Sequence, residues 1–377
     1  MDAVSGFGSY FIPFVLVLSV LVFVHELGHY LVARWCGIRV ETFSIGFGPK
    51  LFGFTDRAGT LWKVSAIPLG GYVKMFGDAD PASTPSERVR TMTEAERAVS
   101  FFHKNVWQRI AVVAAGPIAN FLFAILVLAG LFMAYGQPHT LPQIGQVQPD
   151  SAAAAAGLQP GDTVVAVDGS AIDRFEELQQ IVRMNPGQPM VLEIDRNGER
   201  LSLTATPKDS TVTDDFGNTH RIGLLGIGRT GMEYRQHGPL SAIGQATAET
   251  WNIVTGTFQA LGQMFAGDRG TEELGGPLRI AQMSGQMAQS GLIALVSFTA
   301  ILSVNLGLIN LFPIPLLDGG HLLFYAVEAV RGRPLGERAQ EYGFRVGLAL
   351  VLSLMVFATW NDLVHLRVVD FVRDLFL

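Results

Sequence analysis

Four apolar runs constrain this chain more than any other feature of its sequence. They cover residues 10–32, 110–135, 292–317 and 346–360, and the last can be extended back to Tyr342. A helix needs about 20 predominantly apolar residues to cross a bilayer. Charged residues make up only 16% of the chain, whereas soluble domains carry about a quarter. The sequence therefore predicts an α-helical membrane protein with four transmembrane helices.

The placement of lysine and arginine predicts how these spans are oriented. Residues 1–24 contain neither, residues 34–106 contain ten, and residues 136–291 contain ten over about twice that length. Four more arginines lie between the third and fourth runs. Short cytoplasmic loops are enriched in lysine and arginine. We therefore expect residues 34–106 and 318–345 in the cytoplasm, and residues 136–291 and both termini on the other side.

Charge, cysteine content and the first run exclude several classes of protein. A net charge of −6 with no basic block argues against a nucleic-acid-binding protein. The single cysteine, Cys36, permits neither an internal disulfide nor a cysteine-based zinc site. Residues 10–32 have no basic leading region and no small-residue cleavage site, which argues against a signal peptide.

The first apolar run contains the segment HELGH within "LVFVHELGHYLV". His25 and His29 are four residues apart and share one helical face, so both can reach a single metal ion. Imidazole suits zinc, and a catalytic zinc usually has three protein ligands. Glu26 lies beside that face, where its carboxylate can take a proton from an attacking water. Because ionisable groups are costly inside a membrane and are usually functional there, we favour a catalytic zinc site over two buried structural histidines.

A third ligand is expected where the third run ends, in "NLGLINLFPIPLLDGGHLLF". Pro313 and Pro315 break the helix, and freed backbone is tolerated at membrane depth only against protein or a wet cavity. Asp318 follows and is a candidate ligand, with His321 as a rival. Asp318 is also a suitable N-cap for the helix that "GGHLLFYAVEAV" begins. The spacing favours a ligand over a cap without deciding between them.

The segment between the second and third runs predicts a small α/β domain. Residues 163–167 are β-branched and follow a Pro-Gly-Asp turn, and "RFEELQQIVRM" has helical spacing. Asn197 and Gly198 separate two further β-prone segments, which is a strong hairpin signal. The run "AGLQPGDTVVAVDG" resembles the PDZ domains of bacterial periplasmic proteases, which bind extended peptides along a sheet edge. We expect an inserted PDZ domain over residues 140–230, and whether it binds a peptide or only spaces and shields stays open.

Together these segments resemble the site-2 protease family of intramembrane zinc metalloproteases, in particular its bacterial members that regulate sigma-E. The resemblance covers nearly the whole chain and rests on "HELGHYLVARWCGI", "SIGFGPKLF", "AIPLGGYVKM", "AAGPIANFLFAI", the PDZ segment and "NLFPIPLLDGGHLLF". It implies one zinc ion per chain, held by His25, His29 and Asp318, with Glu26 as the catalytic base. It also implies that Asn310 helps to hold the substrate near the metal.

The segment "WKVSAIPLGGYVKMFG" resembles the membrane-associated β-hairpin of this family. We expect the hairpin over about residues 62–76 on the cytoplasmic side, with its turn at Gly70 and Gly71 between two β-prone segments. The strand edge that includes Tyr72 and Val73 is then open to an unwound substrate. The alternative is a hairpin that only fills the helix bundle.

Three further features complete the comparison with the family. Gly116, Pro117 and Asn120 match its second-span motif, for which we expect a role in close helix packing. The best-known members carry two tandem PDZ domains and this chain has one, so their control of access to the site does not transfer in detail. Residues 78–100 are typical of a solvated loop.

The predicted organisation follows the order of these segments. Residues 1–135 hold the first two spans, the HELGH motif and the hairpin, and residues 140–230 form a periplasmic PDZ domain. Residues 236–291 form amphipathic helices on the membrane surface, since residues 239–265 have a helical pattern. Residues 292–377 hold the last two spans and Asp318.

The resemblance implies a multi-pass protein of the bacterial inner membrane whose active site lies near the cytoplasmic side. Its partners are the lipid bilayer and single-span membrane proteins, such as anti-sigma factors and remnant signal peptides. These substrates are cut within the membrane after a first cut outside the cytoplasm.

Two other function classes compete with this one. A membrane-tethered PDZ adaptor without catalysis predicts that Glu26 is dispensable. A zinc transporter or sensor predicts more buried histidines or carboxylates along the spans. The other histidines are scattered, which argues against that class: His103, His139, His220, His237, His321 and His365.

Overall fold

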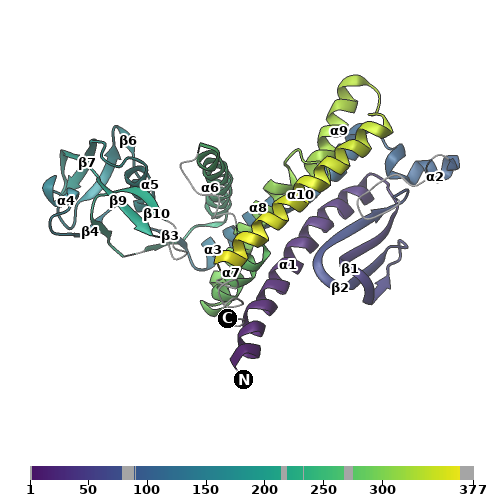
Figure 1. Cartoon of the computed structure of the whole chain (residues 1–377), viewed down its shortest axis with the longest axis horizontal. Helices are drawn as coiled ribbons and strands as arrows, with labels where there is room; N and C mark the ends of the chain where they lie inside the picture. Colours follow the sequence, from purple (N-terminus) through teal and green to yellow (C-terminus); the bar gives the residue numbers. More distant parts are fainter. Residues whose placement is uncertain are drawn as a thin grey trace, which may run out of the picture. The chain divides into compact units, whose positions relative to one another are not determined.

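The structure is a computed structural model that describes residues 2–78, 89, 91–213, 219–231, 233–266 and 275–365 (Figure 1). The chain forms two compact units. The helical unit comprises Met1–Gly130 and Ile243–Leu377, and the inserted unit comprises Leu131–Ala242. Part of the loop predicted over residues 78–100 lies outside the described residues.

Four of the described helices are long and apolar enough to cross a membrane: α1 (Asp2–Trp35), α3 (Val106–Ala134), α8 (Leu292–Asn310) and α10 (Glu337–His365). Each corresponds to one of the predicted apolar runs. The third helix is shorter than its run because prolines 313 and 315 cannot continue an α-helix. The chain crosses this irregular segment and resumes as α9 (Asp318–Arg331).

A hairpin is present, but its extent and turn differ from the prediction, because the predicted range of residues 62–76 lies almost entirely within one strand. Strands β1 (Val40–Thr55) and β2 (Leu61–Met75) pair antiparallel and lie alongside α1 (Figure 1). The turn is formed by Asp56, whose Oδ1 accepts hydrogen bonds from the backbone N–H groups of Ala58 (2.8 Å) and Thr60 (2.9 Å). The prediction of a turn at Gly70 and Gly71 was therefore wrong.

Gly71 lies within β2, paired with Ile45 of β1. Its lack of a side chain serves close packing instead of a turn. A Cβ at this position would lie closer than 3.0 Å to the Val22 side chain on α1 and to the Ser44 carbonyl oxygen. The glycine therefore allows β2 to approach α1, where the HELGH motif lies.

Two more helices follow in the region predicted to hold amphipathic surface helices. They are α6 (Pro239–Ala266) and α7 (Pro277–Gln289). The Asp362 carboxylate on α10 accepts hydrogen bonds from the backbone N–H groups of Gly276, Leu278 and Arg279. Because the first N–H groups of a helix have no partner within it, this carboxylate caps α7. The remaining short helices of the unit are α2 (Glu94–Val99) and the 3-10 turn η2 (Phe101–His103).

The inserted unit is built around a four-stranded antiparallel sheet in the order β6-β5-β7-β8. Its strands are β5 (Thr163–Val167), β6 (Ser170–Ala171), β7 (Met190–Arg196) and β8 (Glu199–Ala205). Helix α5 (Phe175–Met184) packs Leu178 against Leu192 and Ile194 of the sheet. The predicted strand at residues 163–167, the helix and the hairpin about Asn197 and Gly198 are confirmed.

Shorter elements complete the inserted unit. They are β3 (Gln137–His139), β4 (Ile144–Val147), α4 (Ala152–Ala155), β9 (Lys208–Thr213), β10 (Thr219–Leu224), β11 (Ile227–Arg229) and β12 (Glu233–Arg235). Strand β11 pairs with β4, β10 with β9, and β12 with β3, so the end of the unit returns to its beginning.

Candidate metal centre

Two histidines of α1 and the first residue of α9 converge on one point of the helical unit. The Nε2 atoms of His25 and His29 are 3.2 Å apart. Oδ2 of Asp318 lies 3.1 Å from the first and 3.4 Å from the second. The i, i+4 spacing explains why the two histidines lie side by side on α1, while the approach of Asp318 depends on the fold.

This cluster has the dimensions and chemistry of a tetrahedral zinc site. Zinc–nitrogen and zinc–oxygen bonds are about 2.0–2.2 Å, which puts neighbouring ligand atoms about 3.3 Å apart. The three observed separations match that value. The Oδ2 atom of Asp318 is buried and has no hydrogen-bond partner among the described residues, and a buried charge needs compensation. A cation shared by the three atoms provides it.

Helix α3 holds both imidazole rings from the side away from Asp318. His29 donates from Nδ1 to the carbonyl oxygen of Val112 at 2.9 Å, and His25 Nδ1 lies 3.1 Å from the side-chain amide of Asn120. Gly116 lies between these two positions, and a Cβ there would come closer than 3.0 Å to both imidazole rings. Helix α3 can therefore approach the rings only because residue 116 has no side chain.

The structure contradicts one interpretation of Asp318, that it caps α9. Helix α9 has Leu317 at its N-cap position, and no side chain caps the helix. Asp318 is the first helical residue and turns its carboxylate to the histidines, so the N-cap interpretation is wrong. Leu316, two residues before Asp318, has a φ of 102°, which is a strained conformation for a residue with a side chain.

The rival ligand His321 does not join the cluster. Its ring packs against those of Tyr325 and Phe344, with centroids 6.4 Å and 5.3 Å away. Among the described residues, the group able to share a metal ion consists of His25, His29 and Asp318. His321 instead lines the cavity beside that group.

A cavity of about 610 Å³ surrounds the cluster. It is lined by every predicted site residue: His25, Glu26, His29, Gly70, Gly71, Tyr72, Val73, Asn310 and Asp318. The carboxylate of Glu26 accepts a hydrogen bond from the backbone N–H of Val73. Asn310 ends α8, and its Nδ2 donates to the carbonyl oxygen of Leu306 at 3.0 Å. The cavity thus combines the three candidate metal ligands, the Glu26 carboxylate and part of β2.

Sequence reasoning gave Asn120 only a packing role and did not consider Val112. Asn120 is fully buried and is a polar side chain in the middle of an apolar run, which was the available signal. No pattern could identify Val112, because its contribution is a backbone carbonyl.

Comparison with known proteins places the chain in a family. The model of peptidase family M50 matches residues 13–354. A protein of Agrobacterium fabrum named as a zinc metalloprotease is 51% identical over 367 residues, covering 96% of this chain and 97% of the relative. Protease RseP of Yersinia pestis is 37% identical over 451 aligned positions, covering 93% of this chain and 97% of the relative. That alignment is longer than this chain, so this relative has residues with no counterpart here.

Solved structures also resemble part of the chain. The PDZ domain of an SdrC-like protein from Listeria monocytogenes matches at 17% identity with a TM-score of 0.19, covering 26% of this chain and 90% of that structure. The full-length matches are the informative ones. On their extent and identity, the chain belongs to peptidase family M50, the site-2 protease family, and is a zinc metalloprotease.

Proposed function

We propose that this protease cuts single-span membrane proteins within the bilayer of the bacterial inner membrane. The observation that carries the proposal is the cavity in which His25, His29 and Asp318 converge beside Glu26. His25 and His29 lie within the apolar helix α1, and Asp318 begins α9 at the end of the third apolar run. A protease with this site acts on peptide bonds at membrane depth.

In this proposal His25, His29 and Asp318 hold one zinc ion per chain, and Glu26 is the catalytic base. When bound, zinc supplies a Lewis acid that lowers the pKa of water and polarises a carbonyl group. Glu26 lines the same cavity, where its carboxylate takes a proton from the attacking water and passes it to the leaving amine. The contacts of the two histidines with α3 keep their Nε2 atoms directed at one point.

The substrate is bound as an extended strand. A transmembrane helix hides its peptide bonds in internal hydrogen bonds, so it must unwind before cleavage. Strand β2 pairs with β1 on one side, and its segment from Gly70 to Val73 borders the cavity. An extended segment can add to such an edge through main-chain hydrogen bonds. Asn310, which precedes Asp318 by eight residues and lines the same cavity, holds the unwound segment near the metal.

The hairpin and the long helices suit a membrane setting. Exposed apolar side chains on β1 and β2 include Leu51, Phe52, Phe54 and Ile67. Large exposed apolar groups mark contact surfaces. We assign the hairpin to the cytoplasmic side of the membrane, with four helices spanning the bilayer and the inserted unit and both termini in the periplasm.

We assign the inserted unit as a PDZ domain that filters substrates, such as anti-sigma factors or remnant signal peptides, by their size outside the membrane. Deletion of residues 140–230 is then expected to permit cleavage of substrate that has not been shortened. If the intact substrate stays resistant in the deletion variant while the shortened one is cut, the filter proposal is wrong.

The test of the catalytic assignment is Glu26→Gln in the full chain, purified in detergent. We expect cleavage of a single-span reporter to fall by a factor of about 10²–10⁴, the usual contribution of a general base, with zinc content unchanged. Undiminished cleavage would remove Glu26 from the mechanism and leave room for a membrane-tethered adaptor. Absence of zinc from the wild-type protein under zinc-replete conditions would overturn the metal site itself.

A further inference from the structure

Asn120 is buried beside the metal cluster without touching the point where the ligands converge. It lies on α3, is fully buried, and places its amide 3.1 Å from Nδ1 of His25. Its Oδ1 is buried and has no hydrogen-bond partner in the part of the chain that the structure describes. A buried polar atom without a partner costs free energy, so this amide needs a physical explanation beyond helix packing.

The hydrogen bond between His29 and Val112 indicates which kind of partner Nδ1 of His25 needs. A carbonyl oxygen can only accept, so Val112 fixes the proton of His29 on Nδ1. The Nε2 atom of that ring then carries the lone pair that a metal needs. To bind the same metal ion through its own Nε2, which lies 3.2 Å from that of His29, His25 must carry its proton on Nδ1 as well. The partner of His25 Nδ1 must therefore be an acceptor.

The Asn120 side chain can supply that acceptor without any change of packing. The oxygen and nitrogen of a side-chain amide exchange places by a half-turn about the Cβ–Cγ bond, and the shape that neighbours contact stays the same. With Oδ1 toward His25, the orphaned oxygen gains a donor and the ring gains the tautomer that binds metal through Nε2. Histidine ligands commonly donate their second N–H to an oxygen in this way, which sets the tautomer and the ring orientation.

We infer that Asn120 is a positioning residue for the proposed zinc site, accepting a hydrogen bond from Nδ1 of His25 as Val112 does from His29. The inference rests on the proposed function, since it assumes that both histidines bind zinc. It assigns to a residue of the second span a role in metal affinity and not only in helix packing.

The test compares two variants in the full chain in detergent, Asn120→Leu and Asn120→Asp, which both keep the number and branching of the side-chain heavy atoms. Zinc affinity is measured by competition with a chelator of known affinity, and the visible spectrum of the cobalt-substituted protein reports ligand geometry. Loss of an outer partner typically lowers metal affinity by about 10- to 100-fold. We expect that loss in Asn120→Leu. We expect Asn120→Asp to keep wild-type affinity or exceed it, because a carboxylate also accepts from Nδ1–H.

A packing role predicts a different order. Leucine keeps the number and branching of the side-chain heavy atoms of asparagine, whereas a buried carboxylate is the costlier replacement, so packing alone makes Asn120→Asp the weaker variant. Ser303→Ala is the matched control, because Ser303 Oγ donates to the backbone oxygen of Asn120 at 2.9 Å. It alters the same site without altering the His25 contact, and we expect unchanged zinc affinity.

The outcomes separate the inference from the proposed function. Wild type that binds zinc, with Asn120→Leu within twofold of it or Asn120→Asp as weak as Asn120→Leu, overturns the role of Asn120 alone. Wild type that binds no zinc overturns the metal site, and the inference with it. Weak binding by Asn120→Leu with full binding by Asn120→Asp and Ser303→Ala supports the inference.

Discussion

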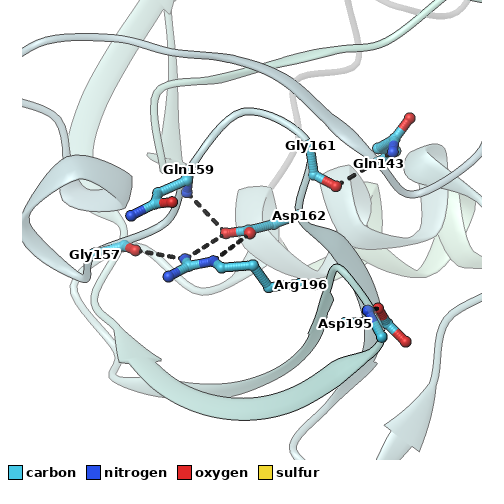
Figure 2. Close-up of polar contacts among 8 residues, drawn as sticks. Gln143, Gly157, Gln159, Gly161, Asp162, Asp195 and Arg196 are labelled. Atoms are coloured by element: carbon cyan, nitrogen blue, oxygen red, sulfur yellow. Dashed lines mark hydrogen bonds and ion pairs between the residues drawn. The ribbon is translucent and has the colours of Figure 1, made fainter.

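Two aspartates with buried carboxylate oxygens, one in each unit, differ in how those oxygens are satisfied. In the inserted unit, both oxygens of Asp162 accept hydrogen bonds from Arg196, at 2.7 Å and 2.8 Å, and one also accepts from the backbone N–H of Gln159 at 2.8 Å (Figure 2). In the helical unit, Oδ2 of Asp318 faces two imidazole nitrogens, and none of the residues that the structure describes donates a hydrogen bond to it.

The difference separates a structural carboxylate from one that is ready to bind a cation. Hydrogen bonds and an ion pair compensate the buried charge of Asp162, so that its removal should weaken the fold. The charge of Asp318 is left for a ligand to compensate, so that its removal should weaken metal binding instead. The predictions below test this division, beginning with the largest expected effect.

Asp318→Asn is expected to lower zinc affinity by more than about 100-fold, since loss of an outer partner alone already costs up to that factor. The thermal unfolding of the metal-free protein should stay unchanged, because no donor is left without its acceptor. Chelator competition and a thermal melt in detergent provide the two measurements. A melt as strongly destabilised as that of an Asp162 variant would remove the distinction between the two aspartates.

Asp162→Asn is expected to destabilise the inserted unit by about 2 kcal/mol, because hydrogen bonds to a buried charged group contribute that much and Arg196 loses its partner. Its side chain is 1% exposed, so water cannot replace these bonds. Amide hydrogen exchange in β5 and β7 of the full chain measures the loss. Zinc affinity serves as the internal control and should match wild type.

Gly116→Ala is expected to lower zinc affinity by about tenfold or more, since a misdirected ligand ring costs at least as much as a lost outer partner. The added methyl group would meet both imidazole rings. Gly130→Ala, on the same helix, is the matched control because nothing lies within 4 Å of a Cβ there. Equal zinc affinities in the two alanine variants would contradict the tight approach of α3 to the metal centre.

The smallest expected effect is on the acid stability of the inserted unit. Burial raises the pKa of the Asp162 carboxyl, but the hydrogen bonds from Arg196 and from Gln159 outweigh it, so the pKa lies below its ordinary value. Its contribution is complete above the unfolded-state pKa of about 3.9 and is lost as the pH falls through the lower folded-state pKa. Wild type and Asp162→Asn should therefore converge in hydrogen-exchange protection at low pH. A constant difference down to the lowest pH would point to packing instead of charge.

The hairpin shows where reasoning from local sequence was insufficient. Gly70 and Gly71 were expected to make the turn, because paired glycines usually do. They lie inside β2, and Asp56 forms the turn through its own side chain. A glycine signals that backbone must pass close to something or adopt an unusual conformation, but the sequence does not show which.

Local interactions made much of this protein predictable from sequence. The spans follow from the cost of polar groups in hydrocarbon, and the shared face of His25 and His29 follows from helical periodicity. The hairpin about Asn197 and Gly198 follows from turn geometry. Each depends on neighbours within a few residues.

Only the tertiary structure decided which groups lie together at the candidate metal centre. Asp318, and not His321, lies beside the two histidines because α9 begins at Asp318 and directs its carboxylate toward α1. Asn120 gained its contact with His25 across 95 residues of sequence, and Val112 contributes a carbonyl that any residue type would carry. Such contacts depend on how helices pack against one another, and that packing is set by the whole unit instead of by local periodicity.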